Sequence, residues 1–417
     1  MWWEKKGHLE INDKNHLSIA GLDACTLAKE YGTPLYVYNK QRIIDNFTAI
    51  KNAFQKHTDN FRIHYAMKAN SNLEILKILY RKGANIDAVS PYEAKIAMDA
   101  GYPQKKIMFT GTSVSNNDLK MLVDDNIFIN IDSLSQIRRL RKIAGNNLNV
   151  SLRWNPGMGA GHHSHTITAG KYVKFGIPES NLAHAVELIK ESGLNLVGLH
   201  QHIGSGWLAD DVLVFLKTVD RTIDTAAKVQ DKIGHNLEFI DFGGGPGIPY
   251  RAEDKEFPLD AYAEGICRKV NSSPLKNSKI AIEPGRYIVG DTGILLLGIN
   301  TVEDKNIPLI GVNGGFNTLA RPSFYGSYHE MIVCNHTASE NKKEFMVAGN
   351  LCESGDVFSE NRETLRKLPI PHEGDILAIL NAGAYGYSMT STYNSRPKPK
   401  ELLIDNKSAK IIRKETW

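Results

Sequence analysis

FRIHYAMKAN, residues 61–70, is a short stretch of mostly β-forming and apolar residues with a lysine, Lys68, near its end. The residues that follow, LEILKILYR at 73–81, carry apolar side chains at the spacing of one helix face. A strand followed directly by a helix is the repeating unit of a parallel α/β fold. This stretch therefore predicts a β-α unit with Lys68 at the carboxyl end of its strand.

The same alternation repeats through the first two thirds of the chain. Strand-like runs occur at 62–66, 86–90, 107–110, 127–132, 150–154, 196–202, 237–242 and 279–283. Helical spacing lies between them, at 72–81, 92–100, 118–125, 136–143, 182–191, 212–233 and 259–270. Eight such units over about 220 residues fit a (β/α)₈ barrel. An open doubly wound sheet is the alternative, but no GxGxxG turn follows the first strand.

The pattern changes after residue 285. Six further runs read as strands, at 294–302, 309–312, 330–334, 344–347, 376–380 and 401–404, and only 360–367 looks helical. The sequence thus predicts an α/β protein with a (β/α)₈ barrel at 36–285 and a mostly β domain at 286–417. Residues 1–35 hold a strand-like piece and a short helix at 21–31, and they pack on one domain or the other.

Composition narrows the class of protein. The 417 residues are 42% hydrophobic and 23% charged, with a formal charge of +4 and no basic block, which disfavours nucleic-acid binding. No apolar run approaches the roughly 20 residues of a membrane span, and the first residues lack the pattern of a secretory signal. Four cysteines without a CxxC pair favour reduced thiols and a cytoplasmic location.

Unusual residues follow the predicted strands at their carboxyl ends, where the active sites of this barrel lie. They are Lys68, Asp87, Ser90, Asn155, Pro156, His200, His202, Gly243, Gly244, Gly245 and Glu283. Lys68 alone reads most simply as a surface lysine. Together with the other residues it reads as a nucleophilic amine, because burial and nearby cations favour the uncharged form.

Two glycine-rich segments suggest a phosphate site. The triple glycine at 243–245 exposes backbone amides, and such a turn leading to a helix suits phosphate, although an empty tight turn has the same sequence. Ser205 in HIGSG at 202–206 adds a hydroxyl one strand earlier. Barrels of this class often bind phosphate on the loops of late strands.

His200 and His202 lie two apart on a strand and so face the same way. Either they bind a metal, or His202 lies against an aromatic cofactor ring while His200 packs below it. The metal interpretation needs further ligands, and no consistent set is found. His162, His163 and His165 form a Gly-rich loop that more simply covers a substrate than holds a metal. Glu283 suits a pyridine nitrogen, which it would keep protonated for a decarboxylation.

The second domain carries dense polar motifs: RPSFY at 321–325, CESGD at 352–356, GAYG at 383–386 and YNSRP at 393–397. With GTPLYVY at 32–38, YAMKAN at 65–70, HIGSG, GGGPGI at 243–248 and EPGR at 283–286, they resemble the diaminopimelate decarboxylases. That group lies within the alanine-racemase-fold decarboxylases, which include the ornithine and arginine enzymes. The likeness spans nearly the whole chain.

The resemblance implies a cofactor, pyridoxal 5'-phosphate, held by Lys68 as a Schiff base with His202 stacked on its ring. It implies that Cys352 returns the proton after decarboxylation. The implied cofactor-binding residues are Lys68, Asp87, His202, Ser205, Gly243, Gly244, Gly245, Glu283, Gly285, Arg286 and Tyr385. The implied substrate-binding residues are Arg286, Arg321, Tyr325, Glu353 and Tyr385. No metal is implied.

The resemblance further implies decarboxylation of meso-diaminopimelate to L-lysine in lysine biosynthesis. It implies a homodimer in which Cys352 and Glu353 enter the partner's site, with no nucleic acid or membrane partner. Departures at Asn350, Gly355, 315–317 and the His-rich segment leave the substrate less certain than the chemistry. The alternatives are the same chemistry on ornithine, arginine, carboxynorspermidine or a carrier-bound amino acid, a metal-dependent hydrolase using His200 and His202, and a non-catalytic homologue.

Overall fold

The computed structural model describes residues 1–158, 168–170, 172–359, 361 and 363–417. The chain divides into two compact units. The barrel unit comprises Asn46–Ile248 and Lys255–Tyr287, and the β unit comprises Met1–Asp45, Pro249–Asp254 and Ile288–Trp417.

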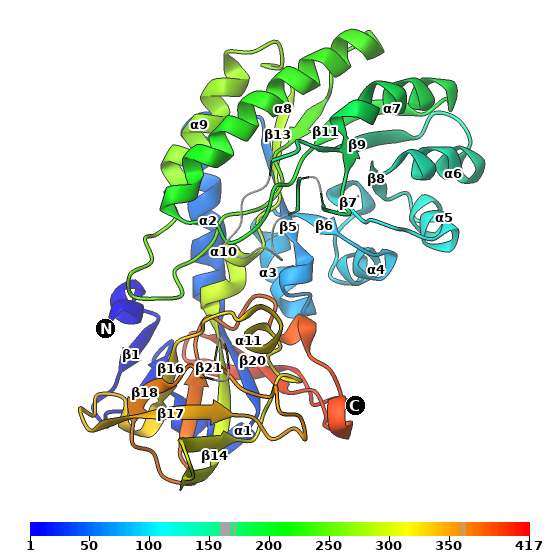
Figure 1. Cartoon of the computed structure of the whole chain (residues 1–417). Coiled ribbons are helices and arrows are strands. Elements are labelled where there is room, and N and C mark those ends of the chain that lie inside the picture. Colours follow the sequence, from blue (N-terminus) through cyan, green and yellow to red (C-terminus); the bar gives the residue numbers. More distant parts are fainter. Residues whose placement is uncertain (159–167, 171, 360, 362) are drawn as a thin grey trace. The chain divides into compact units, whose positions relative to one another are not determined.

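Parallel strands of the barrel unit form a closed ring (Figure 1). They are β5 (Phe61–Ala66), β6 (Asn85–Ala88), β7 (Ile107–Phe109), β8 (Phe128–Ile131), β9 (Asn149–Asn155), β11 (Asn195–His200), β12 (Phe239–Asp241) and β13 (Lys279–Ile282). A short β10 (Ile177–Pro178) adds to β9. Because β8 pairs with β9 and β13 pairs with β5, the ring has no open edge, so the predicted barrel is confirmed and the open sheet is excluded.

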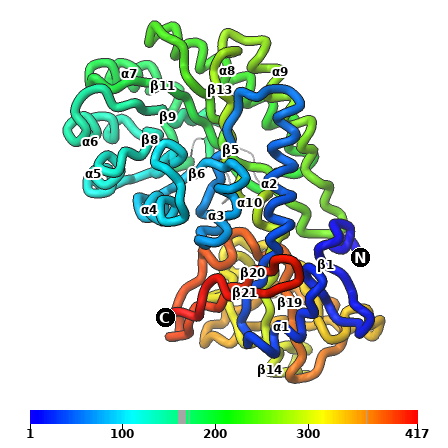
Figure 2. The backbone as a smooth tube through the Cα atoms, turned by 180° about the vertical axis from the view of Figure 1, so that it is seen from behind, coloured from blue at the N-terminus to red at the C-terminus, as the bar shows by residue number. Residues whose placement is uncertain are grey.

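Helices surround this ring, as the view from behind shows (Figure 2). They are α3 (Leu73–Arg81), α4 (Pro91–Asp99), α5 (Asn116–Asp124), α6 (Leu134–Ala144), α7 (Glu179–Glu191), α8 (Val212–Ile233) and α9 (Leu259–Asn271). Helices α3 to α6 are each capped by the residue before their first turn, whose side chain accepts a hydrogen bond from a backbone amide of that turn. The capping residues are Asn72, Ser90, Ser115 and Ser133. Helix α2 (Lys40–Gln55) precedes the first barrel strand.

The β unit contains a small sheet, β1 (Leu9–Ile11), β2 (Leu17–Ile19) and β3 (Leu22–Asp23), and a large one. The large sheet runs in the order β18 (Arg366–Pro369), β17 (Lys342–Ala348), β15 (Pro308–Val312), β14 (Gly293–Asp304), β4 (Leu35–Asn39), β20 (Lys400–Asp405), β21 (Ser408–Arg413), with β19 (Ile376–Ile379) joining β14 to β16 (Met331–Val333). Helices α1 (Ala24–Tyr31) and α11 (Arg321–Tyr325) also belong to the β unit, and α10 (Arg286–Val289) spans the boundary, with Arg286 and Tyr287 in the barrel unit.

The N-terminal segment belongs to the β unit. Strand β4 pairs with β14 on one side and with β20 on the other, and Leu35 to Tyr38 are all buried. Trp3, Leu17 and Leu27 pack in the same apolar core as Leu296. The structure therefore assigns residues 1–45 to the β unit, including residues 36–45 of the segment predicted as the start of the barrel.

The prediction of a helix at 360–367 is wrong for residues 361 and 363–367, and residues 360 and 362 lie outside the described residues. Arg366 and Lys367 are paired antiparallel with Phe345 and Glu344 in strand β18, and Arg366 is buried while Lys367 is exposed. This alternation is that of a strand with one covered face. In the part of the chain that the structure describes, no helix has both the length and the apolar character to cross a bilayer.

Candidate active site

The carboxyl ends of the barrel strands gather Lys68, Asp87, His200 and Glu283, with His202 and the glycine turn just beyond. Lys68 lies in a short 3-10 helix, η2 (Met67–Ala69), that follows β5 directly. Parallel strands end on the same side of a barrel. The residues predicted from separate segments thus share one rim of the barrel unit.

Lys68 and Asp87 form an ion pair at this rim. The Nζ atom of Lys68 is 3.7 Å from Oδ2 of Asp87, which is fully buried on β6. Burial raises the pKa of Asp87, the nearby charge of Glu283 raises it further, and the charge of Lys68 opposes both. Lys68 itself is only partly buried, so its amine is accessible while its carboxyl partner is not.

Glu283 and His200 form a second, fully internal pair. Nε2 of His200 lies 3.1 Å from Oε2 of Glu283. Burial lowers the pKa of His200 more than Glu283 raises it, so the imidazole is neutral and donates its Nε2–H. Burial alone would raise the pKa of Glu283, but His200 and the charge of Lys68 outweigh it and hold that pKa below its ordinary value. Glu283 is therefore an internal carboxylate.

Neighbouring strands add charged side chains to the same inner face. His200 is the register partner of Arg153 on β9 and of Asp241 on β12, and all three are buried. Arg153 lies 3.9 Å from Asp132. Burial raises the pKa of Asp241, and Glu283 raises it further. Arg153 and Asp241 were not singled out from sequence, although an ionisable residue inside each apolar strand was a usable signal.

His202 and the triple glycine are joined by hydrogen bonds. The Gly244 amide donates to Nδ1 of His202 at 3.1 Å, and the Gly243 amide donates to Oδ1 of Asp241 at 2.8 Å. Burial, then the charges of Lys68 and Arg153, lower the pKa of His202 well below its usual value. The ring is thus a neutral imidazole oriented by the turn that follows the next strand.

The two predicted phosphate loops lie side by side. The amides of Gly206 and Trp207 donate to the carbonyl of Gly245 at 2.9 and 3.0 Å, and Gly247 donates to Trp207. A Cβ atom at Gly245 would lie 2.3 Å from the Trp207 ring, so no larger residue fits there. Among the described residues, neither the Gly245 amide nor the Ser205 hydroxyl has a hydrogen-bond partner.

The triple glycine does not lead directly into a helix, and that part of the prediction is wrong. The next helix, α9, begins only at Leu259. Proline follows the turn at once, at Pro246, and recurs at Pro249 and Pro258. The amides of Gly243 and Gly244 already donate hydrogen bonds within the barrel unit, so among the described residues the Gly245 amide is the donor of this turn that a ligand can use.

A metal could be held at the rim on spacing alone. His200, Asp241 and Glu283 offer ligand atoms that all lie within 4.8 Å of one another. His202, the second histidine of the metal hypothesis, is not part of this group, and its Nδ1 accepts from the Gly244 amide. His162, His163 and His165 lie outside the described residues.

In the β unit, Arg321 is the first residue of α11 and is buried. Its Nε donates to Nε2 of His329 and its Nη2 to the hydroxyl of Ser327, both at 3.2 Å. Its guanidinium carbon also lies 5.5 Å from the ring centroid of Tyr250. Tyr325, at the end of the same helix, is partly exposed. The helix therefore holds an oriented guanidinium one turn from a reachable tyrosine.

The loop with Cys352 and Glu353 is arranged around Asp356. The amides of Phe316 and Leu351 donate to this buried carboxylate at 2.7 and 2.8 Å. A Cβ atom at Gly315 would lie 2.5 Å from it, which gives a physical reason for that glycine. Cys352 and Glu353 are exposed, and the Cys352 amide donates to Oδ1 of Asn394 at 2.8 Å.

Tyr385 is held in an unusual backbone conformation. Its φ is +56°, in the left-handed region that non-glycine residues rarely adopt. It lies in the GAYG segment after β19, between a buried Ala384 and Gly386, whose Cβ would lie 2.3 Å from the carbonyl of Ala382. Arg286 is buried at the start of α10, after Glu283 and Gly285.

Known proteins match this chain over its whole length. A family described as "Pyridoxal-dependent decarboxylase, pyridoxal binding domain" matches residues 40–290. Diaminopimelate decarboxylase of Methanothermobacter thermautotrophicus is 44% identical over 98% of this chain and 95% of its own. The crystal structure of diaminopimelate decarboxylase from M. jannaschii in co-complex with L-lysine matches with TM-score 0.89 and 32% identity, over 100% and 96% of the two chains. The Helicobacter pylori enzyme complexed with L-lysine has TM-score 0.86 and 34% identity, over 94% and 96%.

Proposed function

The chain belongs to the diaminopimelate decarboxylases, within the pyridoxal-dependent decarboxylases, and we propose that it converts meso-diaminopimelate to L-lysine and CO₂ as a step of lysine biosynthesis. One observation of the structure carries the proposal. Lys68 lies at a barrel rim whose interior holds an ionised, buried Glu283 paired with a neutral His200. An accessible amine above an internal carboxylate is the arrangement that a pyridoxal enzyme needs.

The residues at the rim fit the cofactor. The Oε1 atom of Glu283 is buried and has no hydrogen-bond partner within the described ranges, so it can accept from a protonated ring nitrogen. Within the described part of the chain the Gly245 amide and the Ser205 hydroxyl have no hydrogen-bond partner, so both can donate to phosphate oxygens. A Cβ atom at Gly244 would lie 2.4 Å from the carbonyl oxygen of Glu283, so a side chain at this position of the glycine turn would not fit. Pyridoxal 5'-phosphate has both groups that these atoms would bind.

Each residue then has one task. Lys68 would hold the cofactor covalently, and its ion pair with Asp87 orients the amine for this. His202, neutral and fixed by Gly244, would lie against the cofactor ring. When bound, the cofactor supplies an electron-withdrawing ring that takes up the electron pair of the broken carbon–carbon bond. Glu283 would keep the ring nitrogen protonated, because it is ionised and His200 holds it in place.

The residues proposed for the phosphate and those proposed for the substrate form two sets that share Arg286 and Tyr385. We assign the phosphate to Ser205, Gly243, Gly244, Gly245, Gly285, Arg286 and Tyr385. We assign the substrate to Arg286, Arg321, Tyr325, Glu353 and Tyr385. Arginines match a carboxylate through two parallel hydrogen bonds, and Glu353 suits the distal ammonium. Ornithine lacks the distal carboxylate and would leave these arginines without it.

Cys352 is proposed to return the proton to the substrate carbon. Its thiol is exposed on a loop fixed by Asp356 and Asn394, so it can reach a bound ligand. We propose that Cys352 and Glu353 act in the site of a partner subunit, in a C₂ homodimer with two shared sites. Four free thiols support a reducing, cytoplasmic setting.

Two rival functions remain to be tested against this one. The same chemistry on ornithine, arginine, carboxynorspermidine or a carrier-bound amino acid keeps the cofactor but changes the substrate. A metal-dependent hydrolase is favoured by the spacing of His200, Asp241 and Glu283. A visible absorbance band of the purified protein would support the pyridoxal cofactor. Bound metal without such a band would support the hydrolase.

The deciding experiment measures CO₂ release from meso-diaminopimelate, L-lysine, L-ornithine and L-arginine at equal concentration. We expect release from meso-diaminopimelate with L-lysine as the product, and little from the three acids without a distal carboxylate. Turnover of ornithine or arginine at the same rate as meso-diaminopimelate would refute the assigned substrate. Absence of visible absorbance together with a bound metal would refute the assigned chemistry.

A further inference from the structure

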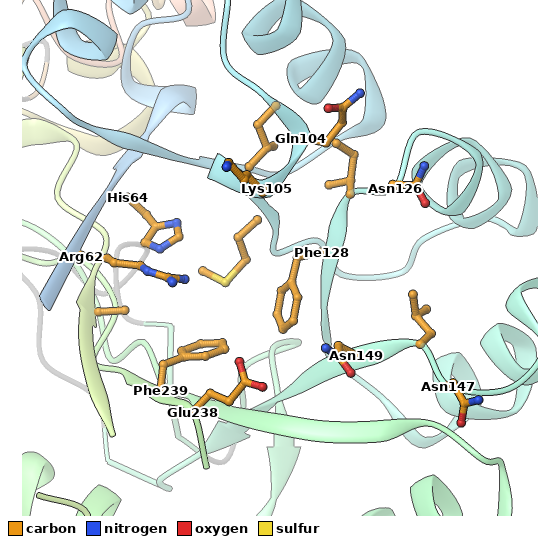
Figure 3. A pocket seen from close by; sticks show the side chains of 15 residues that line it. Arg62, His64, Gln104, Lys105, Asn126, Phe128, Asn147, Asn149, Glu238 and Phe239 are labelled. Carbon is orange, nitrogen blue, oxygen red and sulfur yellow. The ribbon is translucent and has the colours of Figure 1, made fainter. Parts of the chain in front are cut away.

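The barrel unit has a cavity at the end opposite Lys68. It is lined by the first residues of several strands, among them Ile107 of β7, Phe128 of β8 and Phe239 of β12. Its volume is about 380 Å³, within the range of small-molecule sites. Figure 3 shows Arg62, His64, Phe128, Glu238 and Phe239 around it. The candidate active site uses none of these residues.

The floor of the cavity is apolar. Met108, Phe239 and Ala281 form a small buried cluster with Val197, and the partly buried Phe128 packs on it. The rings of Phe128 and Phe239 are 5.6 Å apart in an edge-on arrangement. A Cβ atom at Gly198 would lie 2.4 Å from the Phe239 ring, so this glycine lets the ring lie across the barrel. The barrel strands thus provide an apolar surface that includes two aromatic rings.

The deep end of the cavity carries no charge at neutral pH. His64 lies two residues inward from Arg62 on β5 and is buried. Its Nδ1 is 3.3 Å from the carbonyl of Ile86, which can only accept, so Nδ1 carries the proton. Burial lowers the pKa of His64 to about 4, against smaller opposing effects of Glu283 and Ile86.

The mouth, in contrast, is cationic. Arg62 and Lys105 are exposed and line the cavity, and Glu238 is the acidic side chain among the lining residues. Within the ranges that the structure describes, neither cation forms a hydrogen bond or an ion pair. Lys279 of β13 lies close enough to Arg62 to be affected by its charge, since burial and then the charge of Arg62 lower the pKa of Lys279. With two cationic side chains and one carboxylate among its lining residues, the cavity favours an anionic ligand, whose carboxylate the guanidinium of Arg62 can bind.

We propose that this cavity is a second ligand site that binds a small apolar carboxylate, with its aromatic or alkyl body on Phe128 and Phe239 and its carboxylate on Arg62. The uncharged depth and the cationic mouth fix the orientation of such a molecule. A cation with the same body meets Arg62 and Lys105 unfavourably, and a neutral one gains nothing from them. The site is independent of the proposed reaction, since it lies at the other end of the barrel.

The test compares three probes with one body: phenylbutyrate, phenylbutanol and phenylbutylamine. Binding to the full-length holoenzyme is measured by calorimetry with saturating L-lysine present, so that the catalytic rim is filled. We expect phenylbutyrate to bind about tenfold or more tightly than the alcohol or the amine, the effect of one charge-assisted contact. Equal affinity of the three probes, or no binding of phenylbutyrate, would overturn the proposal.

Variants locate the site. Two variants, Arg62→Gln and Lys105→Gln, are made separately. Both side chains are exposed, so neither substitution should disturb the fold, and each variant tests the site without the other. We expect Arg62→Gln to remove most of the preference for the carboxylate and Lys105→Gln to reduce it. The matched control is Arg138→Gln, an exposed arginine of α6 outside the cavity, which should bind phenylbutyrate like the parent. Unchanged preference in Arg62→Gln would place the probe elsewhere and refute the assignment.

Discussion

Removal of the Lys68 amine breaks its ion pair with Asp87, and the effect on the fold should differ from the effect on the chemistry. Burial already raises the pKa of Asp87, so without Lys68 its carboxyl takes up a proton instead of remaining an uncompensated internal charge. The fold should therefore tolerate loss of the amine, whereas the chemistry should not. This asymmetry makes Lys68 a clean position for a test.

We expect Lys68→Ala to lose the visible absorbance of bound cofactor and nearly all CO₂ release while its circular dichroism stays that of the parent. The reason is that the amine is the proposed point of covalent attachment. Absorption and CO₂ release are measured on the same preparation. The control is Lys95→Ala, an exposed lysine of α4, which should match the parent in both. Normal absorbance in Lys68→Ala would move the attachment to another lysine.

Glu353 offers a second test, at the far end of the substrate. Removing one member of a charge pair that is desolvated on binding costs about 2–5 kcal/mol, or roughly 30- to 5000-fold in kcat/KM. We expect Glu353→Gln to lose that factor on meso-diaminopimelate while the cofactor absorbance is unchanged. Glu344→Gln, an exposed change on β17 of the same unit, is the matched control. Equal kcat/KM for Glu353→Gln and the parent would reject its role in reading the ammonium.

The start of β14 is held by a buried ion pair of a different kind. Asp291 accepts hydrogen bonds from Nη2 and Nε of Arg42 at 2.7 and 3.2 Å and from Lys6 at 3.1 Å. Burial alone would raise its pKa, but Arg42 and Lys6 outweigh it and lower that pKa below the ordinary value. This carboxylate therefore connects the N-terminal segment and α2 to the longest strand of the β unit.

We expect Asp291→Asn to lower the urea midpoint by an amount that corresponds to about 3–5 kcal/mol, the cost of leaving a buried partner unpaired. Asp405→Asn, which removes the half-exposed pair with Lys40, should cost under about 1 kcal/mol. Because the folded pKa of Asp291 is depressed, its contribution is present above about pH 4 and disappears as pH falls through the folded pKa. The difference between parent and Asp291→Asn should therefore stay constant from about pH 7 to about pH 5 and narrow below about pH 4. A gap that does not depend on pH would contradict the ion pair.

Periodicity predicted the helices and strands of the barrel well because most of them bury one face. Helix α8 spans Val212–Ile233, the predicted range, since its apolar side chains recur at helical spacing over six turns. The same reasoning was wrong at the end of the predicted helix, where residues 366 and 367 begin the strand β18, whose four residues are too few to show alternation against charged neighbours. Short edge strands are fixed by their pairing partner, here β17, and not by their own pattern.

The candidate site shows the same limit. Lys68, His202, Glu283 and the glycines were predicted because turn residues and charges interrupt apolar runs. Arg153 and Asp241 were missed, since only the barrel register shows that both adjoin His200. The sequence also could not show which of the two units contains residues 36–45. Strand β4 is apolar enough for either unit, and its pairing with β14 and β20 across more than 200 residues decides the matter.

The whole molecule poses the question of how the barrel unit and the β unit cooperate in catalysis. Lys68 belongs to the first and Cys352 to the second. We proposed that Cys352 acts in the site of a partner subunit. A C₂ dimer built in this way has two identical sites, each with one residue from either chain. That arrangement predicts complementation between two inactive variants.

We expect Lys68→Ala and Cys352→Ala to be nearly inactive as pure dimers and to recover activity when co-expressed. Random assortment gives about half heterodimers, and in each of these one site carries both substitutions and the other carries neither. Total CO₂ release should then reach roughly a quarter of the parental value. Differential tags measure the heterodimer fraction, and Lys68→Ala co-expressed with tagged Lys68→Ala is the control that should stay inactive. If both residues acted within one chain, every heterodimer site would keep one substitution, so heterodimers without recovered activity would disprove the shared site.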